Sequence, residues 1–113
     1  MVDASLTHVT ALRKGVVELA VLSLVADGPK YGQQLVEELA AQPALAVPAG
    51  TVYPLVSRLL KEGLIASTWQ ESPVGPPRKY YRLTDVGSTS LAAMVAAWGH
   101  VRDALDHVIQ EHA

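Results

Sequence analysis

The chain has 113 residues, half of which are hydrophobic, and it contains neither cysteine nor phenylalanine. This length suits one domain with a modest core, and the apolar content excludes a disordered tail. The lack of cysteine excludes thiolate metal sites, disulfides and cysteine nucleophiles, and the lack of a signal peptide also favours a cytoplasmic protein. The longest apolar run, 16–26, contains Glu18 and is too short to cross a bilayer, so we expect no membrane contact.

The net charge of −2 is unevenly distributed along the chain. Residues 50–84 hold five cations against two anions, whereas residues 85–113 hold one cation against four anions. A basic segment followed by an acidic one is typical of a DNA-binding domain joined to a part with another role. We therefore expect a DNA-binding domain at 1–83 and a dimerisation helix at 84–113.

Apolar residues from Thr10 to Ala26 predict a first helix, after nine residues without periodicity. They cover almost the whole circumference of this helix, which predicts burial on more than one side. Because so short a chain covers only part of such a helix, we expect a second subunit to cover the rest. We assign Leu12 and Val16 to that dimer interface.

A turn at 27–29 leads to a second predicted helix at 31–42, which Pro43 ends. The next segment, 48–65, predicts a third helix with two faces. One face is apolar, while the other begins with small residues and continues with cations. The alternative is an ordinary amphipathic helix with a solvated polar face.

The details of the third helix favour DNA binding. We expect Pro54 in its first turn, where the missing N–H costs no hydrogen bond, and Gly63 as a left-handed cap. Small residues permit close approach to a groove, while Arg58 and Lys61 neutralise phosphates beside it. Two helices joined by a turn, the second with such a face, form a helix-turn-helix.

Two runs with strand character, 64–72 and 78–83, predict a hairpin around the proline-rich segment 73–77. Arg78 and Lys79 lie near its tip. Cations clustered beside a helix-turn-helix indicate a wing that contacts DNA, in preference to a plain surface hairpin.

Thr84 is a good N-cap for a last helix at 85–111. Apolar residues in this helix recur in steps of four and three, the coiled-coil pattern, and predict a seam that another copy covers. The seam consists of Leu91, Val95, Trp98, Val101, Leu105, Val108 and His112. The expected fold class is thus mainly α with a small β-hairpin (α+β): a winged helix-turn-helix followed by a long C-terminal dimerisation helix.

Motifs throughout the chain together resemble those of the PadR family of bacterial transcriptional regulators. They are Tyr31-Gly32, Gly50-Thr51-Val52-Tyr53-Pro54, Arg58-Leu59, Glu62-Gly63-Leu64-Ile65, Arg78-Lys79-Tyr80-Tyr81-Arg82-Leu83-Thr84 and Gly87. The resemblance covers nearly all of the chain, and the single C-terminal helix is similar to the short-chain subgroup. It implies a winged-helix domain, a homodimer through the first and last helices, and repression of a neighbouring promoter.

The last helix also resembles that of the multidrug-sensing members, which carry a tryptophan midway along it. In those relatives, paired tryptophans flank a pore at the dimer centre and stack flat aromatic drugs. The resemblance implies a ligand site formed by Trp98, Val95, Arg102, Val17 and Glu18. The alternative is that Trp98 only packs the dimer.

Arg102 stands where the multidrug sensors tend to have an acid. If this cation lines the pore, neutral or anionic ligands are preferred. Glu18, on the facing first helix, offers an alternative, because it can pair with Arg102 and neutralise it.

We expect DNA contacts from the third helix and the wing, with flanking anchors. The full set is Lys14, Gln33, Thr51, Tyr53, Pro54, Ser57, Arg58, Lys61, Arg78, Lys79 and Tyr80. Most of these contacts position the protein without specifying a sequence. Arg58 has an alternative role as the ion-pair partner of Glu62, four residues further along the same helix.

No catalytic motif is present, so we expect no enzyme and no cofactor. His100 and His107, with Asp103 between them, favour a solvated helix face over a metal site. The expected function is a homodimeric repressor that binds a pseudo-palindromic operator in double-stranded DNA and is released by a small, flat, aromatic effector. The alternatives are a regulator without a ligand and a protein-interaction module that does not bind DNA.

Overall fold

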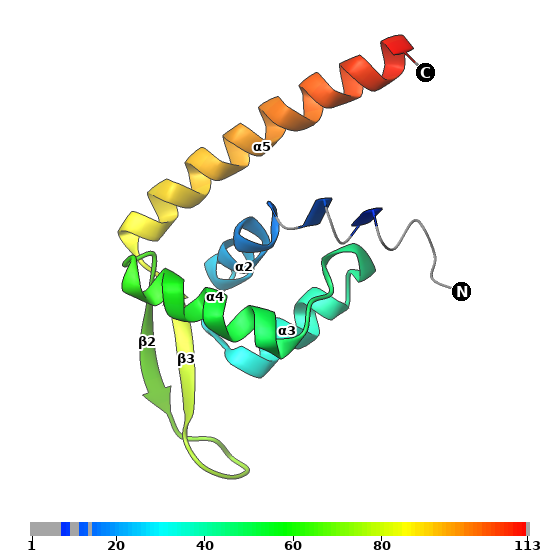
Figure 1. The fold of residues 1–113 in the computed structure, drawn as a ribbon. Coiled ribbons are helices and arrows are strands. Elements are labelled where there is room, and N and C mark those ends of the chain that lie inside the picture. Colours follow the sequence, from blue (N-terminus) through cyan, green and yellow to red (C-terminus); the bar gives the residue numbers. More distant parts are fainter. Residues whose placement is uncertain (1–7, 10–11, 14, 113) are drawn as a thin grey trace, which may run out of the picture.

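The computed structural model describes residues 8–9, 12–13 and 15–112. In chain order its elements are α2 (Val17–Ala26), β1 (Lys30–Tyr31), α3 (Gly32–Ala40), the 3-10 turn η1 (Pro43–Leu45), α4 (Ala49–Lys61), β2 (Ile65–Gln70), β3 (Arg78–Leu83) and α5 (Asp85–His112). In Figure 1, α2 lies between the long helix α5 on one side and the pair α3 and α4 on the other. None of the described helices combines the length and hydropathy that a membrane crossing needs.

The core is formed by the apolar stripes of the three shorter helices and the start of the wing. Its almost fully buried aliphatic residues are Val21, Leu22, Val25, Leu35, Leu39, Val52, Val56, Leu59 and Ile65. Tyr81, from β3, is 7% exposed and packs against this cluster. Each of these three helices thus turns an apolar face inward, as the helical spacing predicts.

Helix α2 begins at Val17, seven residues later than predicted. Residues 8–9 and 12–13 are also helical, but Gly15 and Val16 form a turn ahead of α2. Glycine is a poor helix former because it loses the most backbone freedom on ordering. Helix α2 is therefore shorter than predicted at its start, and Leu12 lies on the far side of the turn.

The sheet has three antiparallel strands in the order β1-β3-β2. Strands β2 and β3 form the predicted hairpin, with Ile65 opposite Leu83 and Gln70 opposite Arg78. Strand β1 was not predicted, because two residues are too few to show periodicity. It pairs Tyr31 with Tyr80, so Tyr31 is extended and α3 begins one residue later than expected.

Helix α4 contains Pro54 in its interior, as its sixth residue. The expectation that Pro54 lies in the first turn was wrong, because the helix already begins at Ala49. Proline at this place removes the N–H that would bond to the carbonyl of Gly50. Gly50 is exposed to solvent, where water can serve that carbonyl.

The end of α4 follows the prediction. Gly63 adopts a positive φ of 76°, which suits glycine because it has no Cβ. Its N–H donates to the Leu60 carbonyl at 3.1 Å, and the N–H of Leu64 donates to the Leu59 carbonyl at 3.0 Å. These two bonds form a Schellman motif, which directs the chain into the wing.

Thr84 joins the winged domain to α5. Its hydroxyl donates to the carbonyls of Gly63 at 2.6 Å and Leu64 at 3.0 Å, and accepts from the N–H of Gly87 at 3.0 Å. A Cβ on residue 87 would collide with the Leu64 carbonyl oxygen. Thr84 is thus the predicted N-cap, and glycine at 87 allows the first turn of α5 to lie against the end of α4.

Candidate nucleic-acid interface

Helix α4 turns one line of residues directly away from the core. The line consists of Gly50, Pro54, Ser57 and Lys61, which we call the outward ridge, and all four are exposed. Steps of four, three and four residues stay on one side of an α-helix. The ridge is therefore small and smooth for two turns and ends in a cation.

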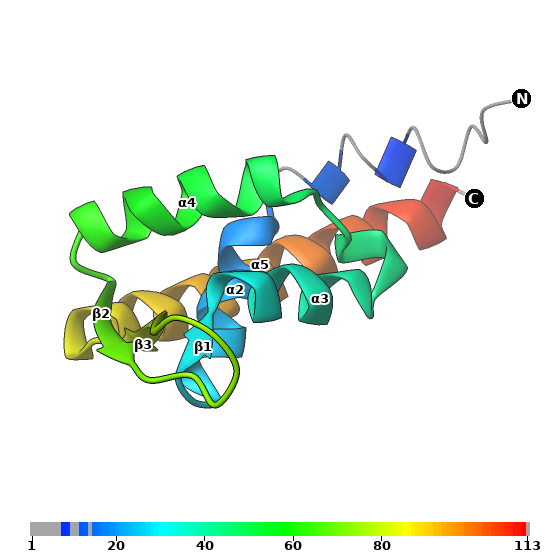
Figure 2. The ribbon, with the colours of Figure 1, turned by 90° about the horizontal axis from the view of Figure 1, so that it is seen from below.

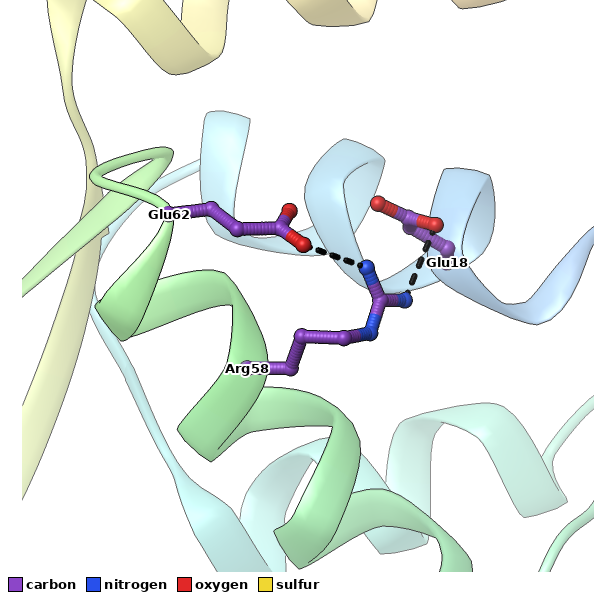
Figure 3. Close-up of polar contacts among 3 residues, drawn as sticks. All are labelled: Glu18, Arg58 and Glu62. Atoms are coloured by element: carbon purple, nitrogen blue, oxygen red, sulfur yellow. Dashed lines mark hydrogen bonds and ion pairs between the residues drawn. The ribbon is translucent and has the colours of Figure 1, made fainter.

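A second line of α4, formed by Thr51, Leu55, Arg58 and Glu62, faces α2. Arg58 donates from Nη2 to Glu18 Oε2 on α2 and from Nη1 to Glu62 Oε1, both at 3.0 Å (Figure 3). The hydrogen bond that Arg58 donates to Glu18 first, and the one that it donates to Glu62 second, raise the pKa of Arg58 above its ordinary value. The ion pair with Glu62 that the spacing offered as an alternative is present, and Glu18 adds a second carboxylate.

The suggested pair between Glu18 and Arg102 was wrong. Glu18 points toward α4, whereas Arg102 donates to its neighbour Asp103 at 3.3 Å. Helix periodicity did not reveal this, because Glu18 and Arg58 are forty residues apart and meet only in the fold. One signal was available: Glu18 is the single charged residue in α2 and therefore needs a partner or solvent.

The third face of α4 carries Tyr53, whose ring lies over Gly32 at the start of α3. A Cβ on Gly32 would collide with this ring, with Cζ and Oη only 2.8 Å away. Two motifs that are separate in sequence, Tyr31-Gly32 and Tyr53-Pro54, therefore meet at one place. Tyr53 remains 42% exposed, and it lies beside the outward ridge because it is three residues after Gly50 on the same helix.

The two cations at the base of the wing loop lie on opposite faces of the hairpin, because successive strand residues alternate. The Arg78 guanidinium lies over the ring of Tyr31, 4.5 Å from its centroid. The ring of Tyr31 in turn meets that of Tyr80 edge-on at 5.4 Å. On the other face, Lys79 Nζ lies 5.9 Å from the centroid of Tyr81.

The cations among these candidate DNA contacts differ in whether a carboxylate already neutralises them. Within the described part of the chain, no carboxylate pairs with Lys61, Arg78 or Lys79, in contrast to Arg58. Gln33 is exposed in the first turn of α3. The predicted anchor Lys14 lies outside the described residues.

Figure 2 shows α3 and α4 side by side, with the hairpin extending from one end of the pair.

A separate apolar hollow of about 680 Å³ lies between α2 and α5, and we call it the Trp98 hollow. Its lining is Val9, Leu12, Arg13, Gly15, Val16, Leu19, Ala44, Leu45, Met94, Ala97, Trp98, Val101 and Leu105. Of the five predicted ligand-site residues, the structure brings only Trp98 here. Val17 is 6% exposed in the domain core, Glu18 faces α4, and Val95 and Arg102 do not line the hollow.

The predicted seam of α5 is largely uncovered in the single chain. Val95, Trp98, Val101, Leu105 and Val108 are between 42% and 59% exposed, whereas Leu91 packs against the core cluster. Farther along, His107 lies 3.5 Å from Glu111, its neighbour four residues on. No group of three metal-ligating side chains occurs among the described residues.

Comparison with known proteins places these features in a family. Residues 21–93 match the model of the transcriptional regulator PadR-like family. A PadR family transcriptional regulator from Eggerthella lenta is similar in structure, with a TM-score of 0.82 and 38% identity, over 91% of this chain and 89% of that one. A PadR-like transcriptional regulator from Bacillus cereus has a TM-score of 0.79 and 36% identity, over 86% of this chain and 94% of that one.

A curated relative from Mycobacterium tuberculosis, described as a transcriptional regulator, is 34% identical over 79 residues. These residues make up 70% of this chain and 72% of the relative. The family and these relatives are regulators of transcription, not enzymes. From the family match over α3, α4 and the wing, together with the likeness of whole structures, we conclude that this chain belongs to the PadR-like family of DNA-binding transcriptional regulators.

Proposed function

We propose that this protein is a homodimeric repressor that binds a pseudo-palindromic operator and releases it when a flat aromatic ligand occupies the dimer centre. In this proposal, residues 1–83 bind DNA and residues 84–113 join two copies. The observation that supports DNA binding best is the outward ridge of α4, whose four residues are all exposed. Figure 1 shows α4 on the opposite side of α2 from α5. We call α4 the recognition helix.

The ridge suits entry into a major groove. Its first residues carry little or no side chain, so the backbone approaches the base edges closely, and Ser57 offers a hydroxyl that hydrogen-bonds to bases or phosphates. Lys61, at its end, and Arg78, on the wing, supply positive charge for the phosphates on either side. Tyr53 borders the ridge and adds an apolar contact surface.

The exposed seam of α5 is the observation that supports dimerisation. Five large apolar side chains in one line are more than a monomer ordinarily leaves in water. A second copy of the same seam, with its four-and-three spacing, covers them by coiled-coil packing. Such a pair holds two recognition helices at a fixed separation, which a pseudo-palindromic site requires.

The Trp98 hollow is the observation that supports a ligand-binding site. Its volume of about 680 Å³ suits a small molecule, and its lining is mostly apolar with one large aromatic side chain. A ligand shifts the dimer only if it has different affinity for the DNA-binding and released arrangements. Trp98 also belongs to the seam, so the second candidate is a regulator whose hollow is filled by the partner's α5.

A fluorescence titration separates these two candidates. Trp69 is the other tryptophan, so the Trp69→Phe variant reports from Trp98 alone. Titration with a neutral, flat aromatic dye should change the Trp98 emission and release operator DNA at matching concentrations. Trp98→Ala should abolish the release while DNA binding remains. An emission that does not change, in a variant that still binds DNA, would favour the regulator without a ligand.

DNA binding itself is tested with the protein's own upstream region. Fluorescence anisotropy should show tighter binding to a duplex that contains an inverted repeat from this region than to a scrambled duplex of equal length. Equal affinity for both would favour the alternative of a protein-interaction module, and would count against the repressor.

A further inference from the structure

The bridge that links Glu18 on α2, Arg58 on α4 and Glu62 at the end of α4 has no assigned role in the proposed DNA contacts (Figure 3). Both hydrogen bonds are 3.0 Å long, and they occupy both terminal nitrogens of the guanidinium. Two carboxylates around one cation leave this cluster with a net negative charge. Other N–H donors of the guanidinium remain, but a phosphate that approached them would be repelled by the two carboxylates.

The direction of Arg58 on the helix leads to the same conclusion. The outward ridge passes through Pro54, Ser57 and Lys61, whereas Arg58 follows the line of Thr51 and Leu55. That second line borders a hollow of about 610 Å³ between the start of α2 and the start of α4. Arg58 therefore extends toward α2 and away from the surface that we propose for the groove.

The hollow also explains why a bridge is useful at this place. Glu18 lines it from α2, while Thr51, Leu55 and Arg58 line it from α4. Because the two helices are not packed directly against each other there, side chains must span the gap to fix their separation. The bridge is a polar link across this hollow.

We infer that Glu18 is a positioning residue for the recognition helix, which it holds through Arg58, and that Arg58 does not contact DNA. This inference rests on the proposal that α4 enters the major groove. The Arg58 and Glu18 side chains are 47% and 30% exposed, and exposed ion pairs contribute little to overall stability. Loss of the bridge should therefore leave the fold intact while the recognition helix becomes less well oriented.

A charge swap tests the inference. All variants carry Glu62→Gln, so that residue 58 faces only residue 18. Arg58→Glu should weaken operator binding by up to about five-fold, the upper range for an exposed ion pair. Adding Glu18→Arg restores opposite charges across the gap and should recover most of the affinity. Glu37→Arg, at an exposed position of α3, is the control, because it adds the same charge without a bridge partner.

Two readouts distinguish positioning from DNA contact and from a general loss of stability. The ratio of operator affinity to scrambled-duplex affinity should fall in Arg58→Glu and recover in the swap, with thermal unfolding nearly unchanged throughout. The salt dependence of binding should stay the same in Arg58→Ala. A slope reduced by about 0.9, the value for one lost phosphate contact, or a swap that fails to recover affinity, would overturn the inference.

A measurement without DNA keeps the bridge testable even if the proposed function fails. Amide hydrogen exchange in the free protein should show faster exchange along 49–61 in Glu18→Gln, and protection restored in the charge swap. Exchange that is identical in the native chain, Glu18→Gln and the swap would show that the bridge does not hold α4. Failure of the operator preference in the native chain, by contrast, would overturn the proposed function alone.

Discussion

Tyr31 connects three parts of the DNA-binding domain. It is the residue that precedes α3, it pairs with Tyr80 in the sheet, and its ring lies beneath Arg78. The sequence identified Tyr31 and Arg78 as parts of motifs but placed Tyr31 in a helix. Its ring contacts lie almost fifty residues away in the chain, so local periodicity does not reveal them.

The contact with Tyr31 should orient Arg78 for a phosphate. In Tyr31→Leu the guanidinium loses its aromatic support, so we expect weaker binding to all duplexes and a salt slope lower by up to about 0.9. Tyr31→Phe keeps the ring and should bind like the native chain. Anisotropy titrations at several salt concentrations measure both. Equal losses in the two variants would mean that the hydroxyl, not the ring face, matters.

Tyr81 should make stability depend on pH in alkaline solution. Burial first, and Tyr53 nearby second, raise the pKa of Tyr81 above its ordinary value of 10.0. The folded chain therefore holds this proton more tightly than the unfolded chain. The stabilisation is complete below the unfolded pKa and is lost as the pH rises through the folded pKa.

Urea unfolding at about pH 8 and about pH 11 measures this effect. The native chain should lose more stability between the two values than Tyr81→Phe, which has no proton to release. If both chains lose the same amount, Tyr81 does not contribute to the alkaline transition.

At the scale of elements, the sequence predicted the long and periodic parts best. The hairpin strand 78–83 and the last helix were predicted nearly to their observed bounds, because alternation and the cap at Thr84 are local signals. Strand β1 depends on tertiary packing, whereas the break before α2 lies at Gly15, a local signal that the apolar periodicity does not include. The interior position of Pro54 depends on where the helix begins, and single residues do not fix that boundary.

In the candidate site, too, some features could be predicted from the sequence and others could not. Helical spacing correctly separated the exposed ridge of α4 from its buried face, because both follow from the 3.6-residue period. It did not separate the ridge from the flank that carries Arg58, since these lie only a fraction of a turn apart. The partner Glu18, on another helix, decides that difference, and only the fold brings it near.

The junction between the wing and α5 should be sensitive to one methyl group. In Gly87→Ala the new Cβ would collide with the Leu64 carbonyl oxygen, a backbone atom that has little room to move. We expect a loss of about 1–3 kcal/mol in the free energy of unfolding, the usual cost of overpacking. Urea unfolding measures it, with the neighbouring exposed position as the control in Ser88→Ala. Equal stability of the two variants would exclude a close contact at residue 87.

For the whole molecule, α2 occupies the central position. Its start lines both the Trp98 hollow, toward α5, and the hollow spanned by Glu18 and Arg58, toward α4. A ligand or a partner helix in the first hollow would contact the helix that carries Glu18. In the proposed dimer this gives a direct physical route from the centre to each recognition helix.

The dimer is the central claim, because a single domain has one recognition helix and cannot bind two half-sites at once. Val101 lies in the middle of the exposed seam and is 59% exposed. Val101→Asp would place a charge in that seam, where it has no partner, while leaving the core of the domain untouched.

Sedimentation velocity at micromolar concentration tests this claim most directly. The native chain should sediment with the mass of two chains, and Val101→Asp should sediment with the mass of one chain while its helical content is retained. A native chain that sediments as a monomer under these conditions would contradict the account.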